Sequence, residues 1–277
     1  MIDDVAQPGS LTGRLFGRVA IVAGSASAIG CGIARRFASE GATVVLIDAD
    51  PAAAERTSHA IGQFGGSVCI IAEAPPSREA ADRTIADILA RCGRVDILVA
   101  AADYRTTWER LLDKTEAAFD EAFRSFREAA VLLQATLPAM RAGGGGSIIA
   151  LGSTYGQSTQ PYIADYLAAK AALKSLVFSA AQEWGPFNIR ANLLTAAADT
   201  EEFRKYRERR GASEIDAGLE QLPMPYRGDV VRDIGGAALF LASDDSRYLT
   251  GEVIHADGGE HLATPLFEPG LDRAEQI

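Results

Sequence analysis

The chain has 277 residues, of which 48% are apolar and 23% are charged, a composition that suits one α/β domain and excludes a disordered or collagen-like chain. No apolar run reaches the ~20 residues of a membrane span, and the net charge of −10 disfavours binding to nucleic acid or to an anionic membrane. The three cysteines, Cys31, Cys69 and Cys92, lack metal-ligand spacing, so we expect free thiols, no metal site and a reducing, cytoplasmic compartment.

The predicted domain occupies residues 17–262, between flexible tails at 1–16 and 263–277. Within it, short aliphatic runs alternate with long Ala-rich amphipathic segments. The predicted strands are Val19–Ala23, Thr43–Ile47, Ser67–Ile71, Ile97–Ala100, Ser147–Leu151, Arg190–Leu194 and Val253–His255. The predicted helices are Gly30–Glu40, Ala52–Phe64, Arg78–Arg91, Thr115–Met140 and Tyr166–Trp184.

Consecutive apolar positions indicate strands that are covered on both faces. The alternation of strand and helix predicts an α/β fold, a doubly wound parallel sheet with helices on both faces. Ligands in such sheets bind beyond the carboxyl ends of the strands, so functional residues are expected where the runs end.

A glycine-rich turn, Gly24–Gly30, follows the first predicted strand and opens a helix. Glycine permits a tight turn and lets a pyrophosphate approach the amide groups of a helix N-terminus. The next strand is followed by Asp48, whose carboxylate can accept both hydroxyls of a ribose and repel a 2′-phosphate, which favours NAD over NADP. Asp48 could instead cap a helix that begins near Pro51.

Three polar residues follow the fifth predicted strand. Ser153 comes first, and Tyr166 and Lys170 are four residues apart, on one face of a helix. A phenol ordinarily titrates near pH 10, and an adjacent ammonium lowers its pKa. Ser153 could orient a substrate oxygen by a hydrogen bond. Each residue alone has an ordinary structural explanation, and only their combination with a dinucleotide loop favours catalysis.

These residues resemble the classical short-chain dehydrogenase/reductase (SDR) family. The resemblance rests on Gly24–Gly30, Ser153, the Tyr166-Leu-Ala-Ala-Lys170 pair and Asn188–Asn192. It continues through Asp233-Ile-Gly-Gly-Ala, Phe240–Ser243, Tyr248–Gly251 and Asp257-Gly-Gly259, and it covers about residues 16–260.

The resemblance implies a single-domain Rossmann-type fold and hydride transfer between NAD and a secondary alcohol or ketone. Tyr166 would be the acid/base, Lys170 would lower its pKa and hold the nicotinamide ribose, and Ser153 would orient the substrate oxygen. The family also implies a substrate lid at about 198–226 and a homodimer or homotetramer. The expected cofactor-binding residues are Gly24, Ser27, Ile29, Gly30, Asp48, Glu73, Ala100, Tyr166 and Lys170. The expected substrate-binding residues are Ser153, Tyr155 and Tyr162.

Four positions depart from the family pattern, all on the cofactor side. Ala28 replaces the middle glycine of the phosphate loop, and Ala100–Asp103 replaces Asn-Asn-Ala-Gly, so that a carboxylate stands where glycine gives room. The catalytic Asn that supports a water in the proton relay is expected near Ser125 or Phe126, and neither is Asn. Ala196–Ala197 replaces Pro-Gly.

The expected lid contains five basic residues within Phe203–Arg210. They could attract an anionic substrate, but a solvated helix face paired with neighbouring acids is the favoured interpretation.

Three functions are compatible with these observations. An NAD-dependent oxidoreductase is favoured, because Asp48, Ser153, Tyr166 and Lys170 are all present. A catalytically impaired SDR subunit that pairs with an active homologue in a mixed oligomer is the alternative, because four positions depart from the family pattern. A cofactor-free lyase like the halohydrin dehalogenases ranks last, because those replace the lysine and lose the dinucleotide loop.

Overall fold

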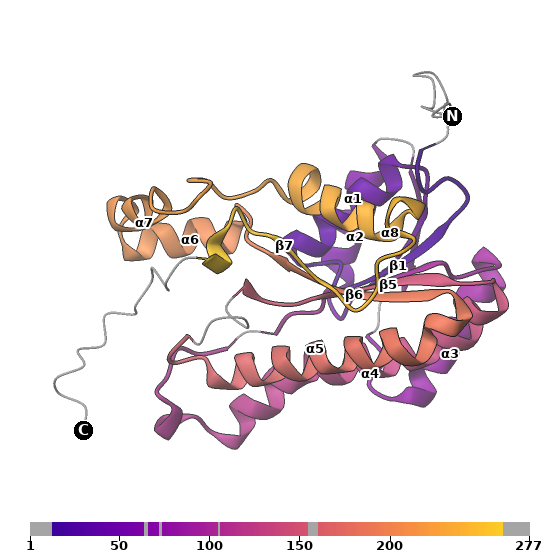
Figure 1. The fold of residues 1–277 in the computed structure, drawn as a ribbon, viewed down its shortest axis with the longest axis horizontal. Helices are drawn as coiled ribbons and strands as arrows, with labels where there is room; N and C mark the ends of the chain where they lie inside the picture. Colours follow the sequence, from indigo (N-terminus) through magenta and orange to yellow (C-terminus); the bar gives the residue numbers. More distant parts are fainter. Residues whose placement is uncertain (1–12, 64–65, 72–73, 105, 155–159, 263–277) are drawn as a thin grey trace.

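The computed structural model describes residues 13–262, apart from 64–65, 72–73, 105 and 155–159. Its centre is one parallel sheet of seven strands with the order β3-β2-β1-β4-β5-β6-β7 (Figure 1). The strands are β1 (Val19–Ala23), β2 (Thr43–Ile47), β3 (Ser67–Ile71), β4 (Ile97–Ala100), β5 (Gly146–Leu151), β6 (Ile189–Ala196) and β7 (Val253–Ala256). The predicted doubly wound parallel sheet is confirmed.

Helices cover both faces of the sheet (Figure 1). One layer consists of α1 (Ala28–Ser39), α2 (Pro51–Gly62) and α8 (Gly235–Ala242). The other consists of α3 (Arg78–Cys92), α4 (Glu116–Ala142) and α5 (Ala164–Trp184). Successive strand side chains point to opposite faces, so Ile21 packs in the core under α3, α4 and α5, whereas Val22 packs under α1 and α8.

The order of the strands reverses between β1 and β4. The chain runs outward from β1 through β2 to β3 and then returns to place β4 beside β1. Ala23 pairs with Ala100, and Ala100 pairs with Ala150, so the loops after β1, β4 and β5 emerge side by side. A doubly wound sheet binds ligands at this point.

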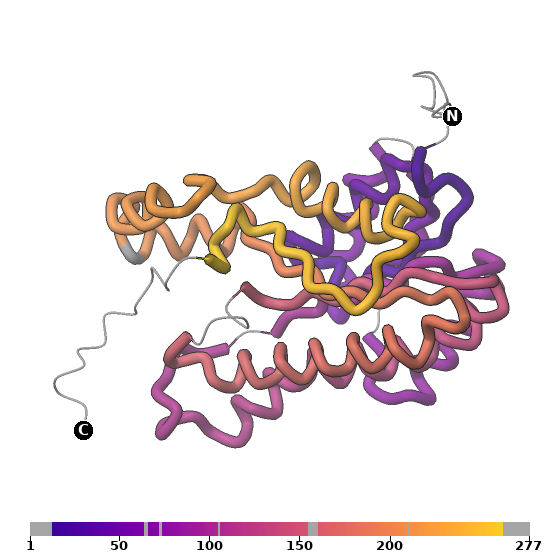
Figure 2. The backbone as a smooth tube through the Cα atoms, in the orientation of Figure 1, coloured from indigo at the N-terminus to yellow at the C-terminus, as the bar shows by residue number. Residues whose placement is uncertain are grey.

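Two further helices, α6 (Glu201–Arg210) and α7 (Ala212–Leu219), follow β6. Figure 2 shows the chain leaving the sheet through them before it returns to α8. They lie within the lid range expected from the sequence. None of the helices in the described part of the chain is long and apolar enough to cross a membrane.

The element boundaries differ from the predicted ones by a few residues. Helix α1 begins at Ala28 because the Ser27 side chain caps it by accepting the N–H of Gly30. Strand β6 extends to Ala196, because its pairing with β7 continues to Ala256. Leu15, which falls in the expected N-terminal tail, is buried, and its N–H donates to the carbonyl of Glu40 at 3.0 Å.

Candidate functional site

The loop after β1 has the tight geometry of a phosphate cradle. Gly24 has a φ of +80°, and a Cβ there would lie 2.4 Å from the backbone nitrogen of Ala102. A Cβ on Gly30 would lie 2.2 Å from the carbonyl oxygen of Gly24. Both positions therefore require glycine. The loop leads straight into the N-terminus of α1, whose first N–H groups have no partner within the helix and favour an anion.

Asp48 lies at the carboxyl end of β2 and faces this loop. Its Oδ2 accepts the N–H of Ala26 at 2.6 Å, and its Oδ1 accepts the N–H of Asp50 at 3.0 Å. The cap of α2 is Asp50, which accepts the N–H of Ala53 at 3.1 Å. The alternative role of Asp48 as a helix cap is thus taken by Asp50.

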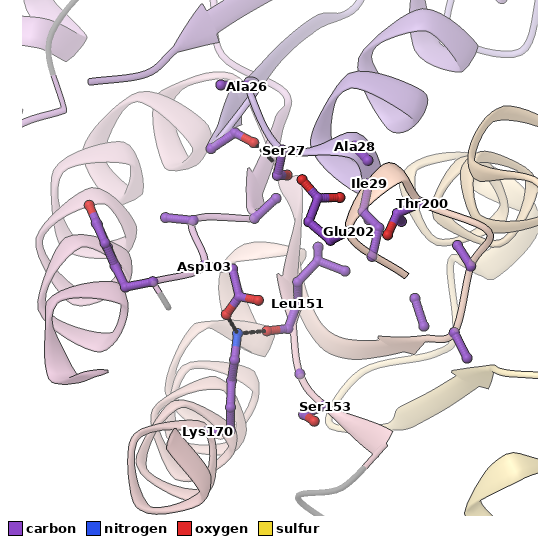
Figure 3. A pocket seen from close by; sticks show the side chains of 18 of the residues that line it. Ala26, Ser27, Ala28, Ile29, Asp103, Leu151, Ser153, Lys170, Thr200 and Glu202 are labelled. Atoms are coloured by element: carbon purple, nitrogen blue, oxygen red, sulfur yellow. Dashed lines mark hydrogen bonds and ion pairs between the residues drawn. The ribbon is translucent and has the colours of Figure 1, made fainter. Parts of the chain in front are cut away.

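A cavity of about 560 Å³ lies above the ends of the strands (Figure 3). Its walls come from the segments that follow each of the seven strands, with α1, α4, α5 and α6. The expected site residues that line it are Gly24, Ser27, Ile29, Asp48, Ser153, Tyr166 and Lys170. The cavity is large enough for a dinucleotide's nicotinamide end with a small substrate.

Ser153, Tyr166 and Lys170 meet at one end of this cavity. Ser153 follows β5, while Tyr166 and Lys170 project from the first turns of α5. Ser153 acts to lower the pKa of the Tyr166 phenol, against the larger effect of burial. The Nζ of Lys170 lies 5.3 Å from the centre of the Tyr166 ring and donates to the carbonyl oxygen of Leu151 at 3.0 Å. The sequence-predicted triad is therefore assembled.

Asp103 also belongs to this cluster. Its Oδ1 forms an ion pair with the Nζ of Lys170 at 3.0 Å. Figure 3 shows Lys170 between Asp103 and the carbonyl of Leu151. The side chain of Lys170 is 3% exposed, whereas that of Asp103 is 48% exposed.

The environment sets the protonation of the two α5 residues. Burial raises the pKa of the Tyr166 phenol, Lys170 opposes this rise, and the Asp103 charge adds to it. Burial acts to lower the pKa of Lys170, but Asp103 and Tyr166 outweigh it, and the pKa is raised. Lys170 thus acts on Tyr166 in the expected direction, yet the net pKa of the phenol is above its ordinary value.

The positions that depart from the family pattern fall around the cavity. Ala28, Ala196 and Ala197 present methyl groups to it. Ser125 is buried in α4, and its hydroxyl donates to the carbonyl of Ala122 in the same helix at 3.0 Å. Phe126 packs against the core. Neither Ser125 nor Phe126 therefore has the side-chain amide that the family places at the relay position.

Other expected site residues lie elsewhere. Gly30 and Ala100 are buried and do not line the cavity; after β4 the lining comes from residues 101–104. Tyr162 does not line it either. It has a φ of 73°, and its carbonyl accepts the N–H of Glu109. Glu73 and Tyr155 lie outside the described residues.

Two contacts made by acidic side chains in the cavity wall were not predicted from the sequence. Glu128 of α4 accepts a hydrogen bond from the Tyr104 hydroxyl at 2.8 Å, and burial raises the pKa of Glu128. Arg227 and Glu260 form a bidentate pair at 2.6 and 2.8 Å, with both side chains nearly buried. Each pair joins residues that are far apart in the chain, and neither carries a sequence signal.

The basic stretch of α6 is paired with acids. Arg204 binds Asp199 at 2.8 Å, and Lys205 binds Glu201 at 2.6 Å. Arg207 makes a bidentate contact with Asp216 of α7. These contacts favour the interpretation as a solvated, paired helix face.

The chain is similar to known oxidoreductases over most of its length. A family model described as enoyl-(acyl carrier protein) reductase matches residues 23–261. The short-chain dehydrogenase/reductase SDRA of Arabidopsis thaliana is 33% identical over 89% of this chain and 95% of its own length. The human dehydrogenase/reductase SDR family member 4 is 30% identical over 88% of each chain. The crystal structure of carveol dehydrogenase from Mycobacterium avium in complex with NAD has a TM-score of 0.80, with 28% identity over 91% of this chain and 100% of that one.

Proposed function

Because the chain belongs to the short-chain dehydrogenase/reductase family, we propose that it is an NAD-dependent oxidoreductase that interconverts a secondary alcohol and a ketone by hydride transfer. The observation that carries the proposal is the cluster of Ser153, Tyr166 and Lys170 in the same cavity as a glycine-rich loop at a helix N-terminus. The proposal includes NAD in preference to NADP, because Asp48 stands beside that loop.

The residues present fit this cofactor. The pyrophosphate would lie against the N-terminus of α1, where Gly24 and Gly30 keep the backbone free of side chains. Asp48 would hold the adenosine ribose, and Lys170 the nicotinamide ribose. When bound, NAD would supply the carbon that accepts or returns the hydride.

Side chains of the protein would accept and return the proton of the substrate hydroxyl. The hydroxyls of Ser153 and Tyr166, which line the same cavity, would hold the substrate oxygen between them. In oxidation the Tyr166 phenolate would take the hydroxyl proton, and in reduction the phenol would return it. The Lys170 ammonium would stabilise the phenolate. Leu151, Ala196, Ala197 and Phe203 give the adjoining wall an apolar character that suits a hydrocarbon substituent.

A turnover assay tests this function. Purified protein would be mixed with NAD and a panel of cyclic and aryl secondary alcohols, and NADH absorbance followed. Loss of a positioned acid/base costs about 10²–10⁴-fold, so we expect Tyr166→Phe to lose at least a hundredfold in kcat. Tyr248→Phe is the matched control, because that side chain is fully exposed. Equal turnover by Tyr166→Phe and the natural protein would contradict the proposed role.

The second candidate, an impaired subunit of a mixed oligomer, is favoured by the ion pair that already engages Lys170 with Asp103. It predicts no turnover by the pure chain and co-purification with an active homologue. Turnover by the pure homodimer or homotetramer, with its mass measured by light scattering, would exclude it.

A further inference from the structure

The buried acid/base pair needs a route by which protons reach solvent. Lys170 is almost fully buried, and in the described part of the chain its Nζ contacts the Leu151 carbonyl and the Asp103 carboxylate. A backbone carbonyl does not carry a proton onward at neutral pH. Of these two partners, only Asp103 is a side-chain acid that reaches water, since about half of its side chain is exposed.

The two positions of α4 where the family's relay residue is expected offer no proton path. The Ser125 hydroxyl donates its hydrogen bond to the Ala122 carbonyl in the same helix, and the Phe126 ring packs against the core. Asp103, in contrast, forms an ion pair with Lys170 at 3.0 Å, and, in addition to burial, its charge raises the pKa of the Tyr166 phenol. The polar connection from Tyr166 to solvent therefore runs along the loop that follows β4.

We propose that Asp103 is a proton-transfer residue that carries protons between the Tyr166–Lys170 pair and solvent. This inference rests on the proposed oxidoreductase function and adds a fourth working residue to it. It assigns a role to a carboxylate that stands where the family pattern has glycine.

The proton step balances in both directions. During alcohol oxidation the substrate O–H bond breaks, its proton goes to the Tyr166 phenolate, and the C–H bond breaks as its electron pair leaves with the hydride. The Tyr166 O–H bond then breaks, its proton passes to the Asp103 carboxylate, and Asp103 releases it to water. Reduction reverses each transfer. Lys170 stays protonated throughout, and its charge holds both the phenolate and the carboxylate in place.

The first test needs neither cofactor nor turnover. Tyrosinate absorbance is titrated with pH, and the Tyr166 signal is obtained by subtracting the Tyr166→Phe curve. The same subtraction is made in an Asp103→Asn background. Because the Asp103 charge opposes formation of the phenolate, we expect the Tyr166 midpoint to move to lower pH in the variant. The other ionisable side chains that line the cavity are unchanged by the substitution: Asp48, Tyr104, Glu128, Glu202, Arg227 and Glu260.

The second test separates proton release from hydride transfer. A pH indicator and NADH absorbance are followed in the same rapid-mixing experiment with Asp103→Ala. We expect proton release to lag behind NADH formation and steady-state turnover to fall at least about tenfold. Added formate, a small carboxylate that fits the vacated space, is expected to restore both. Asp120→Asn, an exposed α4 carboxylate 4.0 Å from Arg127, is the matched control for both tests.

Each outcome decides between the two proposals. An unchanged Tyr166 titration in Asp103→Asn overturns the inference, whether or not the protein turns over. Tighter NAD binding and faster turnover in Asp103→Ala, without a proton lag, would show that Asp103 only obstructs the site and would also overturn it. A shifted titration in a protein that oxidises no alcohol contradicts the dehydrogenase function, yet supports proton coupling between Asp103 and Tyr166.

Discussion

At Gly24 the loop after β1 passes close to the backbone of Ala101 and Ala102, which follow β4. Its φ of +80° belongs to the left-handed region, and a Cβ would lie 2.4–2.6 Å from the backbone of Ala101 and Ala102. The backbone atoms of these two residues cannot move aside as a flexible side chain can. We therefore expect Gly24→Ala to lower the free energy of unfolding by about 2–4 kcal/mol and to weaken NAD binding, as measured by urea unfolding and by a binding titration.

Gly62 is the matched control for this substitution. It is the last residue of α2, it has no positive φ, and a Cβ there would meet no atom within 4 Å. Alanine reduces the conformational freedom of the unfolded chain, so Gly62→Ala should raise the free energy of unfolding by about 0.4–1 kcal/mol. Equal effects of the two substitutions would show that the loop is not strained at Gly24.

The residues of the site differ in how far the sequence can predict them. Gly24, Ser153, Tyr166 and Lys170 follow from spacing, because each sits at a fixed offset from a strand end or along one helix face. The contact of Asp103 with Lys170 joins residues 67 positions apart, and no local pattern encodes it. The pKa of Tyr166 is raised by burial and, to a smaller extent, by the Asp103 charge, so it too requires the three-dimensional structure.

A buried ion pair fixes the segment after β4 to the beginning of α5. The Nζ of Lys114 lies 2.9 Å from Asp165, with both side chains at most 1% exposed, and Thr106 donates to the same carboxylate at 2.8 Å. Asp165 immediately precedes Tyr166 in α5. This contact therefore sets the position of the start of α5 relative to the loop that carries Asp103.

Removing the cation should leave a buried carboxylate without its charge partner. We expect Lys114→Met to lower the free energy of unfolding by about 3–5 kcal/mol, measured by urea unfolding. Arg83→Met is the control, because its pair with Glu79 on α3 is exposed and such pairs contribute about 0–1 kcal/mol. A loss below 1 kcal/mol for Lys114→Met would mean that water or another group replaces the missing charge.

The strands and helices themselves could be predicted well because each has a clear local cause. Consecutive aliphatic residues specify strands buried on both faces, and β1 to β4 have the predicted ends. Disagreements fall where a long-range contact decides the boundary. Strand β6 gains two residues from its pairing with β7, and Leu15 joins the core through its backbone bond to the turn after α1.

At the scale of the whole molecule, the proposed cofactor site joins parts of the chain that are distant in sequence. The cavity draws its walls from the segments that follow all seven strands and from helices on both faces. A ligand that fills it is bound only while the sheet is intact, so binding must stabilise the entire domain against unfolding. Helix α6 contributes Glu202 and Phe203 to the cavity, and Thr200, which caps this helix, lines it too.

This linkage gives a prediction for thermal unfolding. NAD at a hundredfold excess over its Kd should add about 2.7 kcal/mol to the free energy of unfolding, which corresponds to a rise in Tm of about 5–10 °C for a domain of this size. NADP should give a smaller rise at equal concentration, because its 2′-phosphate would face the Asp48 carboxylate. Asp48→Ala should reduce the difference between the two cofactors, which separates recognition at Asp48 from general binding of nucleotides. An unchanged Tm at millimolar NAD and NADP would show that the alanines and Asp103 around the cavity exclude the dinucleotide, and would leave the fold without its proposed chemistry.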